Sequence, residues 1–157
     1  MQHSTNAKNT QNALMEITSR PAIVFTKGRG SWLYDSDGKA YLDFIQGWAV
    51  NCLGHSPAAL VAAISDQAET LINASPAFFN QPMLDLAAAL TGGAGLDQLF
   101  FANSGAEANE GAIKLARKWG QLHRNGAYEI ITTDHAFHGR TLATMAASGK
   151  EGWDTMY

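Results

Sequence analysis

Residues 103–107 (NSGAE) combine a hydroxyl, a glycine and a carboxylate, side chains that can bind a ligand or take part in a reaction. They lie at the start of a long helical repeat. The start of a helix carries unpaired N–H groups and a partial positive charge, so it attracts anions. Ser104 adds a hydroxyl donor, Gly105 lets the backbone approach closely, and Ala106 keeps the side chains small. The segment therefore predicts a phosphate site. However, Ser104 and Glu107 also form the S-x-x-E capping box of ordinary helices, and both interpretations stay open on these residues alone.

A second group of residues that could bind a ligand or a metal lies in residues 134–141 (DHAFHGRT). Without further context, Phe137 is a core aromatic and Arg140 a solvated surface charge. His135 and His138 suggest a metal, but metal sites need three or four ligands and only Asp134 is an additional candidate nearby. We therefore expect no metal site.

The elements that position these groups follow from the apolar pattern. Residues 99–102 and 128–132 predict two strands on either side of a helix that Gly126 ends, which gives one βαβ unit with parallel strands. Two earlier helices are expected to pack on a shared core, one from Ser56 to about Ile72 and one from Gln81 to the pair Gly92–Gly93. Strands over 23–25, 31–34 and 40–44, with a turn at 36–39, predict an antiparallel start. The fold class is α/β.

Composition narrows the classes of function. The chain has 157 residues, 46% of them hydrophobic and 16% charged, which is enough for one globular core. A net charge of -3 disfavours nucleic acid as a partner. No P-loop occurs, and residues 28–30 (GRG) precede a hairpin, so no dinucleotide fingerprint is present. Cys52 is the only cysteine, as expected in the reducing cytoplasm. No signal pattern or apolar run of about 20 residues predicts a membrane segment.

Residues 103–110 (NSGAEANE) and 113–117 (IKLAR) together resemble the phosphate-binding segment of class III aminotransferases, a branch of the fold-type-I pyridoxal-phosphate enzymes. Residues 137–141 (FHGRT), 49–55 (AVNCLGH) and 37–44 (DGKAYLDF) reinforce the resemblance in the correct order. It extends from about Arg20 to Tyr157. Within the class, these motifs are most similar to those of acetylornithine aminotransferases, including the form that also accepts succinyldiaminopimelate.

The resemblance implies pyridoxal 5'-phosphate as cofactor and assigns four kinds of contact. It places the phosphate on Ser104, Gly105 and Ala106. Phe137 would stack on the pyridine ring, where an aromatic face restricts tilt and excludes water. Arg140 would bind the substrate α-carboxylate with its planar fork. Trp48 would line the substrate pocket, where such enzymes commonly carry Ile or Tyr. Residues 17–20 (ITSR) lack the usual substrate-contacting tyrosine.

The resemblance also implies a domain plan. Residues 1–56 would form the N-terminal arm and the small-domain strands. Residues 57–157 would begin the cofactor-binding large domain, a three-layer αβα sheet. The lysine that binds the cofactor covalently and the aspartate at the pyridine nitrogen are expected beyond Tyr157, so no catalytic residue is assigned within this chain. Several lysines fall in segments unlike the family's lysine motif: Lys27, Lys39, Lys114, Lys118 and Lys150. We therefore expect a truncated product or fragment that is inactive by itself.

The activity implied for the complete enzyme is transfer of an amino group between N-acetylornithine and 2-oxoglutarate, in arginine biosynthesis, by a homodimer. Its partners would be amino-acid and 2-oxo-acid substrates. Two alternatives remain open. One is a class III relative acting on ornithine or 4-aminobutyrate, and the other is a non-catalytic fragment that keeps a dimer-forming surface.

Overall fold

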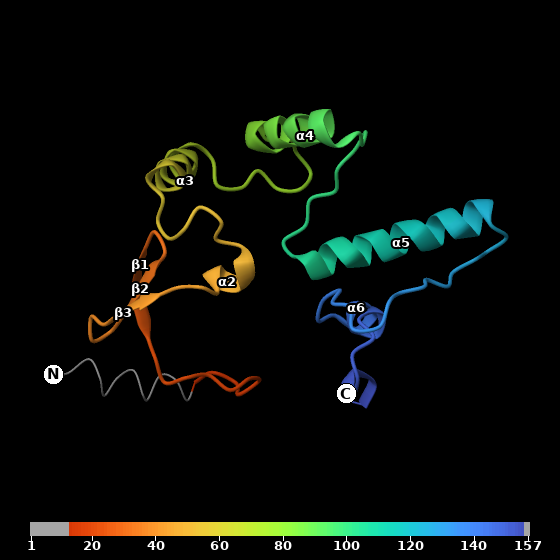
Figure 1. Ribbon diagram of the computed structural model, residues 1–157. Coiled ribbons are helices and arrows are strands. Elements are labelled where there is room, and N and C mark those ends of the chain that lie inside the picture. Colours follow the sequence, from red (N-terminus) through yellow and green to blue (C-terminus); the bar gives the residue numbers. More distant parts are fainter. Residues whose placement is uncertain (1–12, 156–157) are drawn as a thin grey trace. The chain divides into compact units, whose positions relative to one another are not determined.

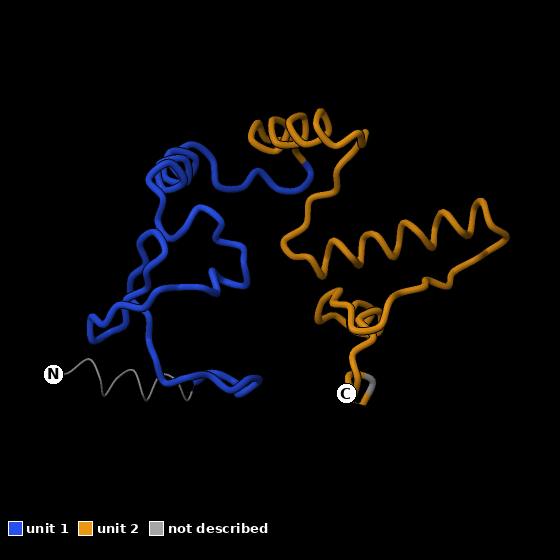
Figure 2. Tube along the Cα trace, viewed as in Figure 1, with its two compact units in different colours: residues 1–77 blue, residues 78–157 orange. Residues whose placement is uncertain are grey.

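The computed structural model describes residues 13–155, which fall into two units, residues 1–77 and 78–157 (Figures 1 and 2). The first unit contains the strands β1 to β3 and the helices α2 and α3. The second contains α4, α5, α6 and the short 3-10 helix η1. The expected domain boundary between residues 56 and 57 stays a prediction.

The first unit contains a three-stranded antiparallel sheet in the order β1 (Phe25–Arg29), β2 (Trp32–Asp35), β3 (Ala40–Leu42). This confirms the predicted antiparallel start and the turn at 36–39, although β1 begins where the expected strand over 23–25 was to end. Asp35 closes the turn because its Oδ1 accepts the N–H of Lys39 at 2.9 Å and its Oδ2 accepts the hydroxyl of Tyr41 at 2.8 Å.

A loop after β3 returns to the hairpin and is fastened there by His55. The backbone N–H of His55 donates to the Gly30 carbonyl at 2.7 Å, and the Gly30 N–H donates back at 2.9 Å. The His55 Nε2 lies 2.7 Å from the Asp43 Oδ2. The other Asp43 oxygen accepts the N–H of Gln46 at 2.9 Å. The His55 ring also fills the space beside Gly28, where a Cβ would lie 2.7 Å from the ring.

The helix that follows starts later than expected. α3 spans Ala58–Thr70, and its N-cap is Pro57, without a side-chain cap. Ser56, the predicted cap, has a left-handed φ of 53° and donates its hydroxyl to the Gly28 carbonyl at 3.1 Å. The prediction of a Ser56 cap was wrong because the hydroxyl has a tertiary partner on β1, which local sequence does not reveal.

α4 (Gln81–Ala94) starts where it was predicted, and Asn80 caps it by accepting the N–H of Met83 at 3.0 Å. Its predicted end at Gly92–Gly93 was wrong, since both glycines lie inside the helix. The helix ends at Gly95, which has a left-handed φ of 65°. A left-handed residue ends a helix because its own conformation breaks the repeat, whereas glycine inside a helix is only unfavourable.

α5 (Gly105–His123) confirms the long helix, but the two predicted strands beside it do not form. In the described residues of the second unit, segments 99–102 and 128–132 pair with no strand. They contact α5 instead. The Phe100 ring lies against Gly111, and the Arg117 Nε donates to the Tyr128 carbonyl at 3.0 Å. The order of segment, helix and segment is as predicted, while the parallel ladder is absent.

No hydrophobic side chain is buried among residues 13–155. The helices α3 and α4 belong to different units, so the expectation that they share a core stays a prediction. The apolar positions of α3 and α4 are about half exposed, for example Ile64 at 60% and Leu86 at 49%. The fully buried side chains are polar: Thr144 and Ser148. None of the described helices combines the length and the apolar character needed to cross a bilayer.

Asp43 is expected to make the attachment of the loop pH-dependent. The N–H of Gln46, and next the His55 ring, hold the pKa of Asp43 below its usual range. The ionised carboxylate therefore stabilises the loop fully above the ordinary aspartate pKa of about 3.9. This contribution is lost as the pH falls through the lower pKa of the folded state.

Amide hydrogen exchange at Gly30 and His55 measures the effect. Protection should fall in the parent below about pH 4, and it should be low and independent of pH in Asp43→Asn, which keeps the shape but not the charge. Asp37→Asn, in the exposed turn, is the control. Equal protection in the parent and Asp43→Asn at pH 6 would contradict this role.

Candidate active site

The first turn of α5 caps itself. The Ser104 Oγ accepts the N–H of Glu107 at 3.3 Å and donates to the Glu107 Oε2 at 3.0 Å, so the capping interpretation is confirmed. The cap does not use the N–H groups of Gly105 and Ala106, which have no acceptor within the helix. The space beside Gly105 is open, because no atom lies within 4 Å of the position that a Cβ would take. Capping and anion binding are therefore compatible at this helix start.

The loop with Phe137 and Arg140 packs directly on this turn through Gly139. Gly139 is buried and has a φ of 140°. A Cβ there would lie 2.6 Å from the Ala106 Cβ and 2.7 Å from the Thr144 Oγ1. Only glycine allows this approach, because any side chain would push the loop away from the helix.

Hydrogen bonds hold the loop in place from both sides. Asn109, in the second turn of α5, donates from Nδ2 to the His138 carbonyl at 2.7 Å, across 29 residues of sequence. The His138 N–H donates to the Ser148 Oγ at 2.9 Å, and this hydroxyl donates to the Thr144 carbonyl at 2.7 Å. Each of these polar groups has a partner, which is the condition for burying them.

The helix after the loop is tied to α5 as well. α6 (Leu142–Ala147) begins with a capping box in which the Thr141 N–H donates to the Thr144 Oγ1 at 3.0 Å. The Thr141 hydroxyl donates to a carboxylate oxygen of Glu110 on α5. Sequence analysis missed the roles of Asn109 and Glu110. Helical spacing indicates that they lie near the start of α5, but nothing in it pairs them with residues 138 and 141.

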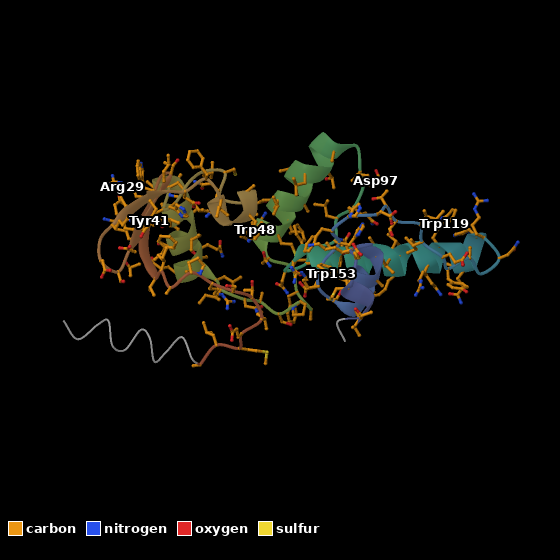
Figure 3. All side chains as sticks on the ribbon, turned by 60° about the horizontal axis from the view of Figure 1, so that its bottom comes forward. Arg29, Tyr41, Trp48, Asp97, Trp119 and Trp153 are labelled. Atoms are coloured by element: carbon orange, nitrogen blue, oxygen red, sulfur yellow. The ribbon has the colours of Figure 1, made fainter. Side chains whose placement is uncertain are left out.

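Phe137 and Arg140 form a cluster with a residue that the sequence analysis did not single out, Trp153 of η1 (Trp153–Thr155). The Arg140 Cζ lies 4.9 Å from the centroid of the Trp153 ring and 5.8 Å from that of Phe137. The two rings meet edge to face at 6.2 Å. Lys150 Nζ lies 5.0 Å from the Trp153 centroid. Figure 3 labels Trp153, which belongs to the second unit.

Trp48 lies in the first unit, whereas the other five predicted site residues lie in the second. Its side chain is 90% exposed, and it belongs to α2 (Gln46–Ala49), a short turn whose residues have left-handed backbone angles. Such angles cost about 1–2 kcal/mol for each residue with a side chain. The role of Trp48 in the substrate pocket stays a prediction.

Within residues 13–155, no three His, Cys, Asp or Glu side chains are grouped as a metal site would require. His138 takes part in the loop through its backbone, and its Nδ1 is buried without a hydrogen-bond partner. Cys52 is exposed and free.

The sequence pattern of the family described as aminotransferase class III matches residues 15–156. The chain belongs to the class III aminotransferases. Members of this family are pyridoxal-phosphate-dependent enzymes, so the resemblance seen in the motifs is confirmed at the level of the family.

Curated class III relatives indicate a subfamily. The chain is 66% identical over 146 residues to acetylornithine aminotransferase 2 of Bordetella bronchiseptica, covering 93% of this chain and 37% of that protein. It is 65% identical over 149 residues to acetylornithine aminotransferase of Ralstonia nicotianae, covering 92% and 37%. The chain thus spans about 37% of the length of these relatives.

Solved structures agree on the fold. A Bacillus anthracis aminotransferase matches the whole chain with a TM-score of 0.86 and 31% sequence identity, and the match covers 37% of its own chain. The prediction of a fold-type-I transferase, preceded by a short antiparallel segment, is confirmed.

Gly139→Ala is expected to separate the loop from the first turn of α5. The added methyl group would overlap Ala106, and alanine at position 139 would have an unfavourable φ. The free energy of unfolding should therefore fall by about 1–3 kcal/mol. The measurement is urea unfolding, followed by circular dichroism.

Gly105→Ala is the matched control, because its methyl group meets no atom within 4 Å. Alanine is also the better helix former, so this variant should be neutral or slightly stabilised. If both variants were equally stable, Gly139 would not be the contact that joins the loop to α5.

Proposed function

We propose that this chain forms the N-terminal part of an enzyme that transfers an amino group between N-acetylornithine and 2-oxoglutarate, with pyridoxal 5'-phosphate as cofactor. The observation that carries the proposal is the packing of Gly139 on Ala106, which brings the loop of Phe137 and Arg140 to the start of α5. The names of the relatives support the choice of amino donor. A role in arginine biosynthesis, a homodimeric assembly and a cytoplasmic location complete the proposal.

The residues present fit the cofactor at two points. Its phosphate requires donors at a helix start and free space, and Ser104 and Gly105 offer both. Its pyridine ring requires an apolar face, and the Phe137 side chain is 65% exposed and therefore accessible. When bound, the cofactor supplies the electron sink that amino transfer needs.

The Ser104 hydroxyl would have to change its partner when the phosphate binds. A hydroxyl has one proton to donate. In this structure it goes to the Glu107 carboxylate. Donation to a phosphate therefore displaces that bond, while the Ser104 Oγ can still accept the Glu107 N–H and keep the cap.

Arg140 would bind the substrate carboxylate. Its guanidinium is exposed, and a planar fork of N–H donors matches a carboxylate in a bidentate pair. The Phe137 ring, 5.8 Å from the Arg140 Cζ, would shield the pair from water on one side and so strengthen it. Binding of this kind orients the amino group of the substrate without itself moving a proton.

We also propose that the 157-residue chain is inactive by itself. Lys27 and Lys39 stack on tyrosines of the first unit, and Lys118 is hydrogen-bonded to Gln121 on α5. Lys150 stacks on Trp153. Each of these amines thus has a described partner other than a residue of the proposed phosphate site.

Gly105→Val tests the phosphate site in a full-length aminotransferase that carries this chain as its N-terminal segment. The open space beside Gly105 accepts the side chain, so the fold should persist, but a β-branched group in the position of the phosphate should weaken cofactor binding by at least about tenfold, or ~1.4 kcal/mol. Titration of the cofactor absorbance measures the affinity.

Glu107→Ala is the control, since it removes the carboxylate that accepts the Ser104 hydroxyl, keeps the capped backbone N–H and does not block the phosphate. It should lower mainly the melting temperature, read by circular dichroism of the cofactor-free protein. A folded Gly105→Val enzyme with the affinity of its parent would leave Ser104 a helix cap only.

Arg140→Lys, in the same full-length enzyme, tests the reaction. Lysine keeps the charge and loses the fork, and a hydrogen bond to a charged group contributes about 1.5–3 kcal/mol. The kcat/KM for N-acetylornithine should therefore fall roughly 10- to 150-fold, with cofactor affinity unchanged. The assay follows glutamate formed from N-acetylornithine and 2-oxoglutarate. A parent that forms none contradicts the proposed function, and a variant within about twofold of its parent contradicts the role of Arg140.

A further inference from the structure

The cluster around Trp153 places a cation, Arg140, on the face of an indole ring that a second aromatic supports. The Arg140 Cζ lies 4.9 Å from the Trp153 centroid, within the range of a cation–π contact. Phe137 meets the indole edge to face at 6.2 Å. The backbone N–H of Trp153 donates to the Lys150 carbonyl at 3.1 Å, and η1 contacts α6. Trp153 is therefore fixed to the element that follows the loop of Arg140.

We propose that Trp153 is a positioning residue that holds the Arg140 guanidinium in the orientation that binds the substrate carboxylate. The proposal rests on the proposed function, because it assigns a partner to the arginine that would bind substrate. It adds to that site a residue from η1, outside the motifs of the helix start and the loop.

The two interactions of Arg140 are compatible in geometry. Stacking uses the flat face of the guanidinium, while bidentate binding of a carboxylate uses its N–H groups, which lie in the plane and point outward. An exposed arginine populates many rotamers, and ordering it on binding has an entropic cost. A ring that already holds the guanidinium reduces this cost before substrate arrives, which is preorganisation.

The same unit contains a second arginine–tryptophan pair, which provides a matched control. The Arg124 Cζ lies 5.2 Å from the centroid of Trp119. This pair lies roughly four turns along α5 from Ser104, about 22 Å at the rise of a helix. Figure 3 labels Trp119 near the far end of α5. The Arg124–Trp119 pair has the same cation–π contact, but neither residue is proposed to bind substrate.

The test compares Trp153→Leu, Trp153→Phe and Trp119→Leu in the full-length aminotransferase, with two amino donors that differ in one group. These donors are N-acetylornithine and N-acetylputrescine, the same amine without the α-carboxylate. Trp153→Leu should lower kcat/KM about five- to tenfold for N-acetylornithine and less than twofold for N-acetylputrescine. Trp153→Phe keeps an aromatic face and should recover most of the loss. Trp119→Leu should change neither value.

A second readout is independent of catalysis. In the 157-residue chain, the Arg140 side-chain Hε resonance should be shifted upfield by the ring current of Trp153. The shift should disappear in Trp153→Leu and persist, reduced, in Trp153→Phe. An Arg140 resonance that Trp153→Leu leaves unchanged overturns the proposal.

The kinetic outcomes separate the two hypotheses. An equal loss for both donors means that Trp153 only supports the fold, and no loss means that it does not act on Arg140; either result overturns the inference while the proposed function stands. A parent that uses ornithine and not N-acetylornithine contradicts the proposed substrate, and the test then runs on ornithine and putrescine. A parent without any transamination overturns both.

Discussion

The contact between Gly139 and Ala106 is the constraint on which the second unit depends. Two segments with the predicted cofactor and substrate residues meet there, and the approach is so close that position 139 has no room for a side chain. The hydrogen bond from Asn109 to the His138 carbonyl and the bond between Thr141 and Glu110 then fix the angle of the loop against α5. Without the glycine, those bonds would have to stretch, because the loop backbone would move outward.

This junction is held by polar groups, which is unusual for the centre of a unit. Thr144 and Ser148 are fully buried, whereas no apolar side chain among the described residues is. Burying a large apolar side chain contributes about 1.5–3 kcal/mol to stability. The exposed apolar side chains of α3 and α4 therefore do not make this contribution. The chain spans about 37% of the length of its curated relatives. At this junction the fully buried side chains, Thr144 and Ser148, are held by hydrogen bonds.

The start of α5 illustrates how one sequence satisfies two requirements. Ser104 and Glu107 cap the helix, and the same turn leaves Gly105 facing open space. The capping box and the phosphate site were alternatives at the level of sequence, but in three dimensions the cap leaves the Gly105 and Ala106 N–H groups unused, so the two are compatible. Only the Ser104 proton would be shared between the cap and the proposed phosphate site, so the Glu107 carboxylate is the partner that an anion would displace.

The sequence by itself determined the local elements and the family. The periodicity of α5, the turn at 36–39 and the start of α4 at Gln81 all depend on near neighbours, and the motifs at 103–110 and 137–141 identified the class III aminotransferases. Tertiary structure decided what depends on partners distant in the chain: the bond from the Ser56 hydroxyl to the Gly28 carbonyl, the lack of a strand ladder beside α5 within residues 13–155, and the stacking of Arg140 on Trp153. The reason is physical. Helix propensity and capping act over a few residues, whereas strand pairing, close packing and cation–π contacts require that remote segments meet, and no local pattern specifies which ones do.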